Sequence, residues 1–499
     1  MVHLAKRMIR LASFGMRALF VIGIAMSLCL NGLVAQETWR RSYGGLGSDN
    51  AMSIEECESG GYILAGTTGS FGHGSSDIYL IRLNEQGDLI WSRYFGGLGA
   101  DVGVGCHESN GGFVLAGTMN DAAAGDYSMT LIKTDATGAL MWQVNYGGSD
   151  WDICKGVLML PDGYLLHGIS YDGQSPQGGG VAIRTDFEGA VLWEHRVVSA
   201  EASSLNGGLA LPDGSVVLCG SLNTSNGDKD GFLMRLNANG DEAWLTPYGG
   251  NEDDLFNAVA GRSDGGFMAC GSSRSVASVQ RIALCGFGSD GSFEWERFIG
   301  NETDASGADI DRAGSDRFVF TGYSELTGGQ RDMIVTLVTE FGWFLNGNNF
   351  GNGSPADGSS VDTTTDGGFV AAGWIESIGP GPRAIYVVKT DQDCLTSSTS
   401  VESLFDPVPV QEFLPSDSQI TLTPNPLDSG ARLNIHGSSR ELQRFVIHDS
   451  SGRAIARSAQ GWISSTGIDM PTDVEGLCHL TLYFRDGTTS THPLVVLSE

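Results

Sequence analysis

The chain reads Trp-Arg-Arg-Ser-Tyr-Gly-Gly at residues 39–45, and a tryptophan then returns every 51 or 52 residues. The later copies are Trp91, Trp142, Trp193, Trp244 and Trp295. One more interval reaches Asn346, inside a segment (residues 339–351) that otherwise keeps the pattern. A fixed period of this length indicates that one supersecondary unit is repeated along the chain. Seven such units fit before the chain changes character near residue 394.

Each unit is predicted to contain four strands. Residues 39–43 alternate apolar and polar side chains, and residues 51–57 form a second strand after the Gly-Gly pair. A turn at residues 59–61 has the glycines that tight hairpins require. Residues 62–67 are apolar on both faces, as expected between two neighbouring sheets, and residues 78–83 complete the unit. Seven four-stranded antiparallel units predict an all-β fold, a seven-bladed β-propeller over residues 36–396.

The way the predicted ring closes is also visible in the sequence. The seventh unit stops at residues 390–394, where its tryptophan strand should begin. A strand with the missing sequence stands at residues 37–43, before the first complete unit. We expect this N-terminal strand to complete the last blade, because doing so removes two free sheet edges.

Residues 1–35 have the composition of a signal peptide. Four basic residues precede an apolar run at residues 18–30, which is shorter than the ~20 residues needed to span a bilayer. No later run is long enough for a transmembrane helix, so the mature chain is expected to be exported without one. Eight single cysteines follow, and Cys219 and Cys270 share a repeat position that takes small residues. This favours buried free thiols, with disulfides as the alternative.

The chain is strongly acidic. It has 29 basic and 59 acidic residues, for a formal net charge of −30. Such a surface repels a phosphate backbone, so nucleic acid is not expected as a partner. The same charge suits a soluble protein in an extracellular environment.

A second domain is predicted after a Ser/Thr-rich linker at residues 397–419. Residues 420–499 contain short alternating segments separated by Gly, Ser and Asp, which predict a small β-sandwich. The run Leu-Thr-Pro-Asn-Pro at 422–426 and the run Asp-Ser-Ser-Gly-Arg at 449–453 resemble the C-terminal sorting domain of type IX secretion substrates. The residues that carry this resemblance are Pro424, Asn425, Pro426, Asp449, Gly452 and Arg453.

This resemblance implies a partner and a destination. The partner would be the type IX secretion machinery, and the protein would cross the periplasm and the outer membrane to be secreted or held at the cell surface. The repeats in turn resemble bacterial seven-bladed propeller units with W…Y-G-G…D-G-G-Y…A-G-T spacing, a family whose members mostly lack an assigned activity.

Aspartates recur in the loops of one face of the predicted disc. They are Asp49, Asp101, Asp152, Asp254, Asp304 and Asp357 after the Gly-Gly pair, and Asp77, Asp126, Asp230 and Asp332 before the fourth strand of the unit. One interpretation is a ring of carboxylates that binds a cation or a glycan. The other is that each Asp caps its own loop by accepting backbone N–H groups. Recurrence in most blades favours the second interpretation.

Two groups of residues on that face are candidates for binding. The run Asn-Gly-Asp-Lys-Asp-Gly at 226–231 resembles a calcium loop with Asn226, Asp228 and Asp230 as ligands, but its twelfth position is Asn237 instead of Glu. No cofactor is therefore expected, with calcium as the alternative. Tyr323 and Trp374 occupy equivalent positions in adjacent units. Their rings could stack on a sugar or complete the core between blades.

Catalytic signatures such as G-x-S-x-G and H-E-x-x-H are missing, so no catalytic residue is assigned. The sequence favours an exported, non-enzymatic propeller whose loop-rich face binds a glycan, a protein or a matrix component. The alternatives are a secreted carbohydrate-active enzyme using carboxylates near the channel, and a purely structural surface protein. An enzyme should carry acidic residues that are unique to one blade and point into the channel. A scaffold should carry only the repeated aspartates.

Overall fold

The computed structural model describes residues 36–405 except 122–124, 149, 172–176, 198, 200, 301 and 352, and after residue 405 it describes the strands β30 to β38. The predicted signal peptide, residues 1–35, lies outside the described residues, as does most of the predicted linker after residue 405. Among the described residues, no helix is long and apolar enough to cross a membrane.

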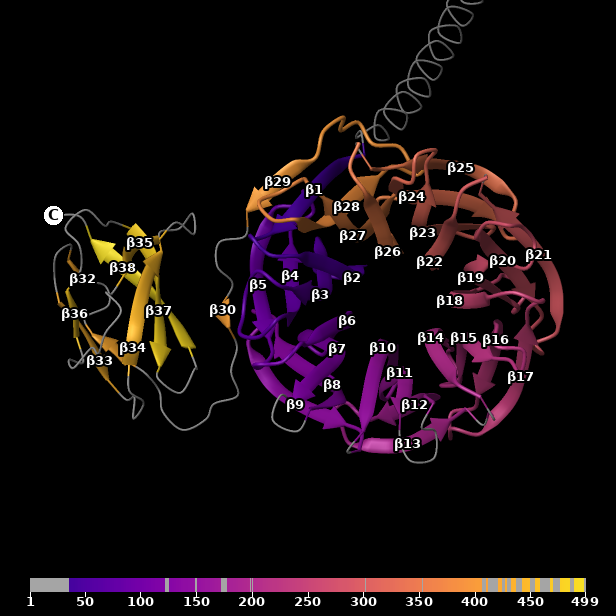
Figure 1. Ribbon diagram of the computed structural model, residues 1–499, viewed down its shortest axis with the longest axis horizontal. Coiled ribbons are helices and arrows are strands. Elements are labelled where there is room, and N and C mark those ends of the chain that lie inside the picture. The colour runs from indigo at the N-terminus through magenta and orange to yellow at the C-terminus, as the bar shows by residue number, and fades with distance from the viewer. Residues whose placement is uncertain are drawn as a thin grey trace, which may run out of the picture. The chain divides into compact units, whose positions relative to one another are not determined.

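Strands β1 to β28 form seven antiparallel sheets around a central axis (Figure 1). Blade 1 consists of β2 (Asp49–Glu56), β3 (Tyr62–Thr68), β4 (Asp77–Leu83) and β5 (Leu89–Phe95). Blade 2 consists of β6 (Val102–Ser109), β7 (Gly112–Asp121), β8 (Asp126–Asp135) and β9 (Leu140–Tyr146). Blade 3 consists of β10 (Trp151–Leu160), β11 (Gly163–Tyr171), β12 (Gly179–Thr185) and β13 (Val191–Arg196).

The other four blades repeat this order. Blade 4 consists of β14 (Ser203–Ala210), β15 (Val216–Asn223), β16 (Lys229–Leu236) and β17 (Glu242–Tyr248). Blade 5 consists of β18 (Asp254–Gly261), β19 (Phe267–Ser273), β20 (Arg281–Phe287) and β21 (Phe293–Ile299). Blade 6 consists of β22 (Ala305–Arg312), β23 (Arg317–Glu325), β24 (Arg331–Thr339) and β25 (Phe344–Asn349). Blade 7 consists of β26 (Ala356–Thr363), β27 (Phe369–Glu376), β28 (Arg383–Thr390) and β1 (Trp39–Gly44).

The predicted seven-bladed ring and its closure are confirmed. Strand β1 pairs antiparallel with β28, from Trp39 opposite Lys389 to Tyr43 opposite Ile385. Beyond β1, the short strand β29 (Glu402–Phe405) adds to blade 7 in parallel, and β30 (Val410–Gln411) adds to β5 of blade 1. Part of the predicted linker therefore forms strands that cover the outer edges of blades 7 and 1, where unpaired backbone groups would otherwise face solvent.

The hydrophobic core lies between adjacent blades. One buried cluster joins Tyr62 and Leu64 of blade 1 to Val370 and Val387 of blade 7. The middle strands are buried on both faces, as the apolar runs predicted. The expectation of free thiols is confirmed for the seven cysteines whose side chains are described, all of them buried and unpaired: Cys57, Cys106, Cys154, Cys219, Cys270, Cys285 and Cys394.

The recurring tryptophan connects each blade to the next. It lies on the outermost strand, and its ring covers a glycine in the β-turn of the following blade. An ideal Cβ on Gly87 would lie 2.7 Å from the Trp39 ring, and Gly87 has φ +79°. The same contact joins Trp91 to Gly138, Trp142 to Gly189, Trp193 to Gly240, Trp244 to Gly291 and Trp295 to Gly342. Only glycine leaves room for the ring and adopts this φ without strain.

The contact between blades 6 and 7 differs. Asn346 replaces the tryptophan, and Cys394, with φ +59°, replaces the glycine. Nδ2 of Asn346 donates to the carbonyl of Asp393 (2.7 Å), and Nδ2 of Asn348 donates to the carbonyl of Cys394 (2.9 Å). Hydrogen bonds therefore take the place of the ring contact where the repeat is broken.

The C-terminal strands form two sheets. One contains β31 (Thr421–Thr423), β33 (Arg432–His436) and β36 (Gly467–Asp469). The other contains β32 (Leu427–Asp428), β38 (Thr489–Leu497), β37 (Gly476–Phe484), β34 (Leu442–His448) and β35 (Ala454–Arg457). The packing of these sheets as a β-sandwich stays a prediction. The six residues that carry the sorting-domain resemblance lie outside the described residues.

Candidate functional site

The inner strands of the seven blades are arranged around one central axis (Figure 1). They line a central channel with a volume of about 1200 Å³. Each inner strand has a β-bulge at the same repeat position, where one extra residue is inserted. The bulged residues all line the channel: Met52, Val104, Lys155, Asn206, Asn257, Ala308 and Ser359. Because a bulge redirects the side chains around it, this ring of positions determines the chemistry of the wall.

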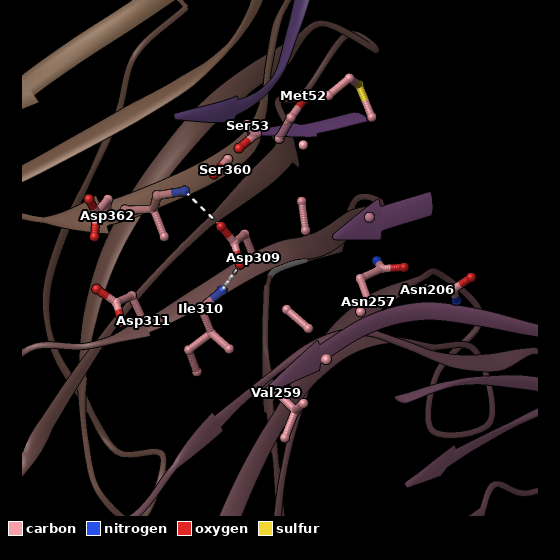
Figure 2. Close-up of a pocket in the computed structure, with 18 of the residues that line it drawn as sticks. Met52, Ser53, Asn206, Asn257, Val259, Asp309, Ile310, Asp311, Ser360 and Asp362 are labelled. Atoms are coloured by element: carbon pink, nitrogen blue, oxygen red, sulfur yellow. Dashed lines mark hydrogen bonds between the residues drawn. The ribbon is translucent and has the colours of Figure 1, made fainter. Parts of the chain in front are cut away.

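The channel wall is polar on one side and mostly apolar on the other. The residue three positions after the bulged residue differs between blades and, from blade 1 to blade 7, is Glu55, His107, Leu158, Leu209, Ala260, Asp311 and Asp362. One position beyond the bulge, Asp309 stands where other blades have Gly, Ala or Ser. Figure 2 shows Asp309, Asp311 and Asp362 together on one part of the wall. The carboxylates thus come from blades 6, 7 and 1.

These carboxylates hold neighbouring blades together. Asp309 accepts a hydrogen bond from the N–H of Val361 (2.9 Å), and Asp362 accepts one from the N–H of Glu56 (2.7 Å). Asp311 accepts from the N–H of Thr363 (3.0 Å). An innermost strand is a sheet edge with unpaired N–H groups, and these side chains satisfy them across each blade junction. Burial raises the pKa of Asp309 to about 6 and that of Asp362 to about 8.

His107 extends the polar wall into blade 2. Its Nδ1 lies 2.5 Å from Oε2 of Glu55, and its Nε2 lies 3.0 Å from the carbonyl oxygen of Val157. Burial lowers the pKa of His107, but the hydrogen bond and charge of Glu55 outweigh burial, so the pKa is raised. Both ring nitrogens face acceptors, which favours the imidazolium form. His107 therefore also links three blades.

The predicted loop caps are confirmed in four blades. One carboxylate oxygen accepts the N–H of a glycine four residues earlier, at 2.7–2.9 Å, in Asp49, Asp101, Asp152 and Asp254. Asp304 and Asp357, which were expected to cap the corresponding loops, stand one residue to either side of this capping position. Ala305 and Ala356 occupy the capping position, as their pairing with Ser324 and Ile375 shows. In a strand, a shift of one residue turns the side chain to the opposite face.

Asp357 consequently lines the mouth of the channel on the face that carries the loops. Tyr323 and Trp374 line the same cavity, so the structure brings these two predicted residues together. Trp374 is the cross-strand partner of Asp357. Asp357, like Asp309 deeper in the channel, is an acidic residue that occurs at its repeat position in one blade only, and the sequence could not separate it from the repeated aspartates.

Two arginines complete the channel mouth. The guanidinium of Arg331 lies 4.1 Å from the ring centre of Tyr323, and that of Arg383 lies 3.9 Å from the ring centre of Trp374. Nη1 of Arg331 also lies 3.9 Å from Oδ2 of Asp357. Burial, opposed by the charges of both arginines, raises the pKa of Asp357 to about 7. The cluster combines aromatic, cationic and acidic groups around one opening.

The sequence contained a signal for these arginines. An aromatic residue, a glutamate two positions later and an arginine at the start of the next strand recur in blades 6 and 7: Tyr323, Glu325 and Arg331, then Trp374, Glu376 and Arg383. Arg383 also forms an ion pair with Glu376 (3.0 Å). Comparing the two loops position by position would have shown that this set of an aromatic residue, a glutamate and an arginine occurs in both blades.

The residues of the calcium-like loop take different roles. Residues 224–228 form a tight turn, in which the Thr224 hydroxyl donates to Oδ1 of Asp228 and Asn226 is exposed. Asp230 lies on β16, opposite Leu222. Among the described residues there is no group of three or more His, Cys, Asp or Glu side chains suited to hold a metal. Calcium at this loop stays a prediction.

Comparison with known proteins agrees with the repeat but does not assign an activity. A family model described as "Domain of unknown function (DUF5122) beta-propeller" matches residues 211–241. No relative is found among curated proteins. Among solved structures, a protein of unknown function from Bacteroides caccae is similar to this chain at 12% identity, covering 54% of this chain and 88% of its own (TM-score 0.33).

Two further solved structures show the same level of similarity. A protein of unknown function from Dyadobacter fermentans is 11% identical over 70% of this chain and 97% of its own (TM-score 0.42). Drosophila Semaphorin 2a is 9% identical over 92% of this chain and 97% of its own (TM-score 0.42). At these scores none of the three bears on the function of this chain.

Proposed function

We propose that this protein is an exported, non-enzymatic propeller that binds a glycan at the channel mouth between blades 6 and 7. The observation that carries the proposal is the placement of Tyr323, Asp357 and Trp374 around one opening, with Arg331 and Arg383 stacked on the two rings. Clefts that bind small ligands combine apolar rings with a few convergent polar groups. The rings offer surface to the C–H groups of a sugar, and the charged groups can hydrogen-bond its hydroxyls.

The charge balance of the site favours a neutral glycan. Arg331 and Arg383 are matched by Asp357 and Glu376, so the mouth carries little net charge. The arginine side chains are 44% and 39% exposed, which leaves donors available to a ligand. A polyanionic ligand would in addition meet the net charge of −30.

A second candidate function is glycoside hydrolysis. Its support is that Asp357 is an acidic residue unique to one blade, lies in the channel mouth and has a pKa raised to about 7. A carboxylic acid that stays protonated near neutral pH can act as a general acid. This reaction would need a second carboxylate, and the carboxylates of the inner wall are occupied by backbone N–H groups.

The proposed route of export is the type IX secretion machinery, reading residues 420–499 as its address. The support is the sequence resemblance described above. Removing residues 420–499 should leave the propeller in the periplasm, whereas the full chain should appear outside the outer membrane. Cell fractionation with an antibody against the propeller measures this. Equal amounts of both proteins outside the cell would contradict the proposed address.

A glycan array with the purified full-length protein tests the proposed function. Binding should be lost in Trp374→Ala and weakened in Asp357→Asn. The matched control is Trp151→Ala, since Trp151 is an exposed tryptophan that does not line the channel. Product release on the array that disappears in Asp357→Asn would favour the hydrolase. Binding that Trp151→Ala reduces as much as Trp374→Ala would reject this site.

A further inference from the structure

Unpaired carboxylate oxygens concentrate at two blade junctions. Within the part of the chain that the structure describes, the buried carboxylate oxygens without a hydrogen-bond partner belong to Asp77, Asp230 and Asp254. Asp77 begins β4 of blade 1, and Asp230 holds the same position on β16 of blade 4. Asp254 is the loop cap of blade 5. A buried carboxylate without a partner is costly, so each of these oxygens needs an explanation.

The geometry is clearest between blades 1 and 2. Asp77 and Asp101 are each 1% exposed. They face each other across Gly96: an ideal Cβ on Gly96 would lie 2.2 Å from Oδ1 of Asp77 and 2.5 Å from Oδ2 of Asp101. Oδ1 of Asp77 is the unpaired oxygen, and it is aimed at the second carboxylate. Two buried carboxyl groups therefore approach each other beside this glycine.

The junction between blades 4 and 5 carries a carboxylate at each of the same two repeat positions, Asp230 and Asp254. Oδ1 of Asp230 lies over Gly249, where an ideal Cβ would be 2.0 Å away. Asp254 is 1% exposed, uses Oδ2 to accept from Gly250 and leaves Oδ1 without a partner. Burial and the charges of Asp228 and Asp254 raise the pKa of Asp230. Both carboxylates of this junction thus leave an oxygen unpaired.

The junction between blades 6 and 7 supplies a natural contrast. Asp332 has the position of Asp77 and Asp230, but Ala356 replaces the second carboxylate. There Asp332 accepts a hydrogen bond from Nε2 of Gln330 (3.3 Å). Unpaired oxygens therefore occur at the two junctions where both carboxylates are present. Where Ala356 replaces one carboxylate, the side-chain amide of Gln330 donates a hydrogen bond to the other. The pattern points to something that the pair binds jointly.

We propose that the Asp77–Asp101 pair and the Asp230–Asp254 pair each bind one divalent cation, with Ca²⁺ as the ion that fits their chemistry. Ca²⁺ takes carboxylate oxygens, backbone carbonyl oxygens and water as ligands, so the two carboxylates of each pair would supply part of its shell. Burial raises the pKa of Asp77, Asp101 and Asp230, and a bound cation would favour the ionised form of each. These sites differ from a linear loop centred on Asp228, whose Oδ1 already accepts from Thr224.

Calcium titration of the EDTA-treated full-length protein by calorimetry tests the proposal. The protein should bind two Ca²⁺, and saturating CaCl₂ should raise the melting temperature by about 2 °C or more. Asp77→Asn and Asp230→Asn should each reduce the stoichiometry to one, and the double variant should bind none. If Asp77→Asn does not fold, Asp101→Asn removes a charge from the same pair, and its amide oxygen can still cap Gly97.

Two control variants give the experiment its specificity. Asp332→Asn should still bind two ions, because Ala356 leaves that junction with one carboxylate. Asp228→Asn should also bind two, whereas a linear calcium loop would lose its ion. The proposal is overturned if the wild-type protein takes up no Ca²⁺, or if Asp228→Asn loses an ion that Asp230→Asn retains. It is equally overturned if Asp77→Asn stabilises the protein without any calcium effect, because the pair would then share a proton.

Discussion

Substituting Gly87 by alanine tests the contact that produces the repeat. Two costs are expected, and the structure separates them. Alanine at φ +79° adopts a left-handed conformation, which costs about 1–2 kcal/mol. Its Cβ would also lie 2.7 Å from the Trp39 ring, and overpacking of this kind costs about 1–3 kcal/mol. Gly87→Ala should therefore lower the free energy of unfolding by about 2–5 kcal/mol.

The matched control is Gly367→Ala. Gly367 has φ +87° in a turn on the same face, and its N–H also bonds the carbonyl three residues earlier. An ideal Cβ there meets nothing within 4 Å, so only the conformational cost of about 1–2 kcal/mol applies. Urea unfolding followed by circular dichroism measures both variants.

A double-mutant cycle completes the test. In a Trp39→Ala background the ring is gone, so Gly87→Ala should cost no more than Gly367→Ala. Equal losses for Gly87→Ala and Gly367→Ala in the wild-type background would refute the steric explanation of the conserved spacing between tryptophan and glycine.

Three further predictions concern closure, charge and backbone strain. Deleting residues 36–45 removes the buried Trp39 and Tyr43 and should lower the melting temperature by about 10 °C or more, as scanning calorimetry would show; an unchanged curve would contradict closure by β1. The pKa of Asp362 is raised to about 8 in the folded protein, so its contribution to stability is present below pH 4 and is lost as the pH rises towards 8. Asp362→Asn should therefore show a smaller decline in melting temperature over that range than the wild-type protein. An identical decline in the two proteins would reject this assignment. Ser377 is exposed and has φ +57°, so Ser377→Gly should raise the free energy of unfolding by about 0.5–1 kcal/mol in urea titrations, whereas a loss would show that its conformation is unstrained.

The ring was predictable because its signal is carried by a pair of residues that is the same at six of the seven blade junctions. The tryptophan and the glycine it covers are forced by one contact, so the period is visible in a single sequence. The inner bulge is just as regular in space, but Met52, Lys155 and Asn257 share no chemistry, because each side chain projects into an open channel. A position that tolerates any side chain leaves no repeat to detect.

The candidate site was predictable in part. Tyr323 and Trp374 differ from the residues of most other blades, which made them visible. Asp357 was hidden because an aspartate occurs in nearly the same place in other loops, and its pairing with Trp374 depends on a register shift of one residue. Such a shift changes which face a carboxylate occupies while leaving the composition of the segment unchanged.

Pairing β1 with β28 determines when the protein can finish folding. Trp39 pairs with Lys389, which follows it by 350 positions in the sequence. The first strand of the domain therefore has no partner until nearly the whole propeller has been synthesised. Contacts of such large sequence separation form slowly, and an intermediate that still lacks them exposes the open edge of blade 7. A chain interrupted before residue 383 would leave β1 without a partner. Completion of blade 7 is therefore required for folding of the whole ring, because a chain that lacks β28 cannot pair β1 and close the propeller.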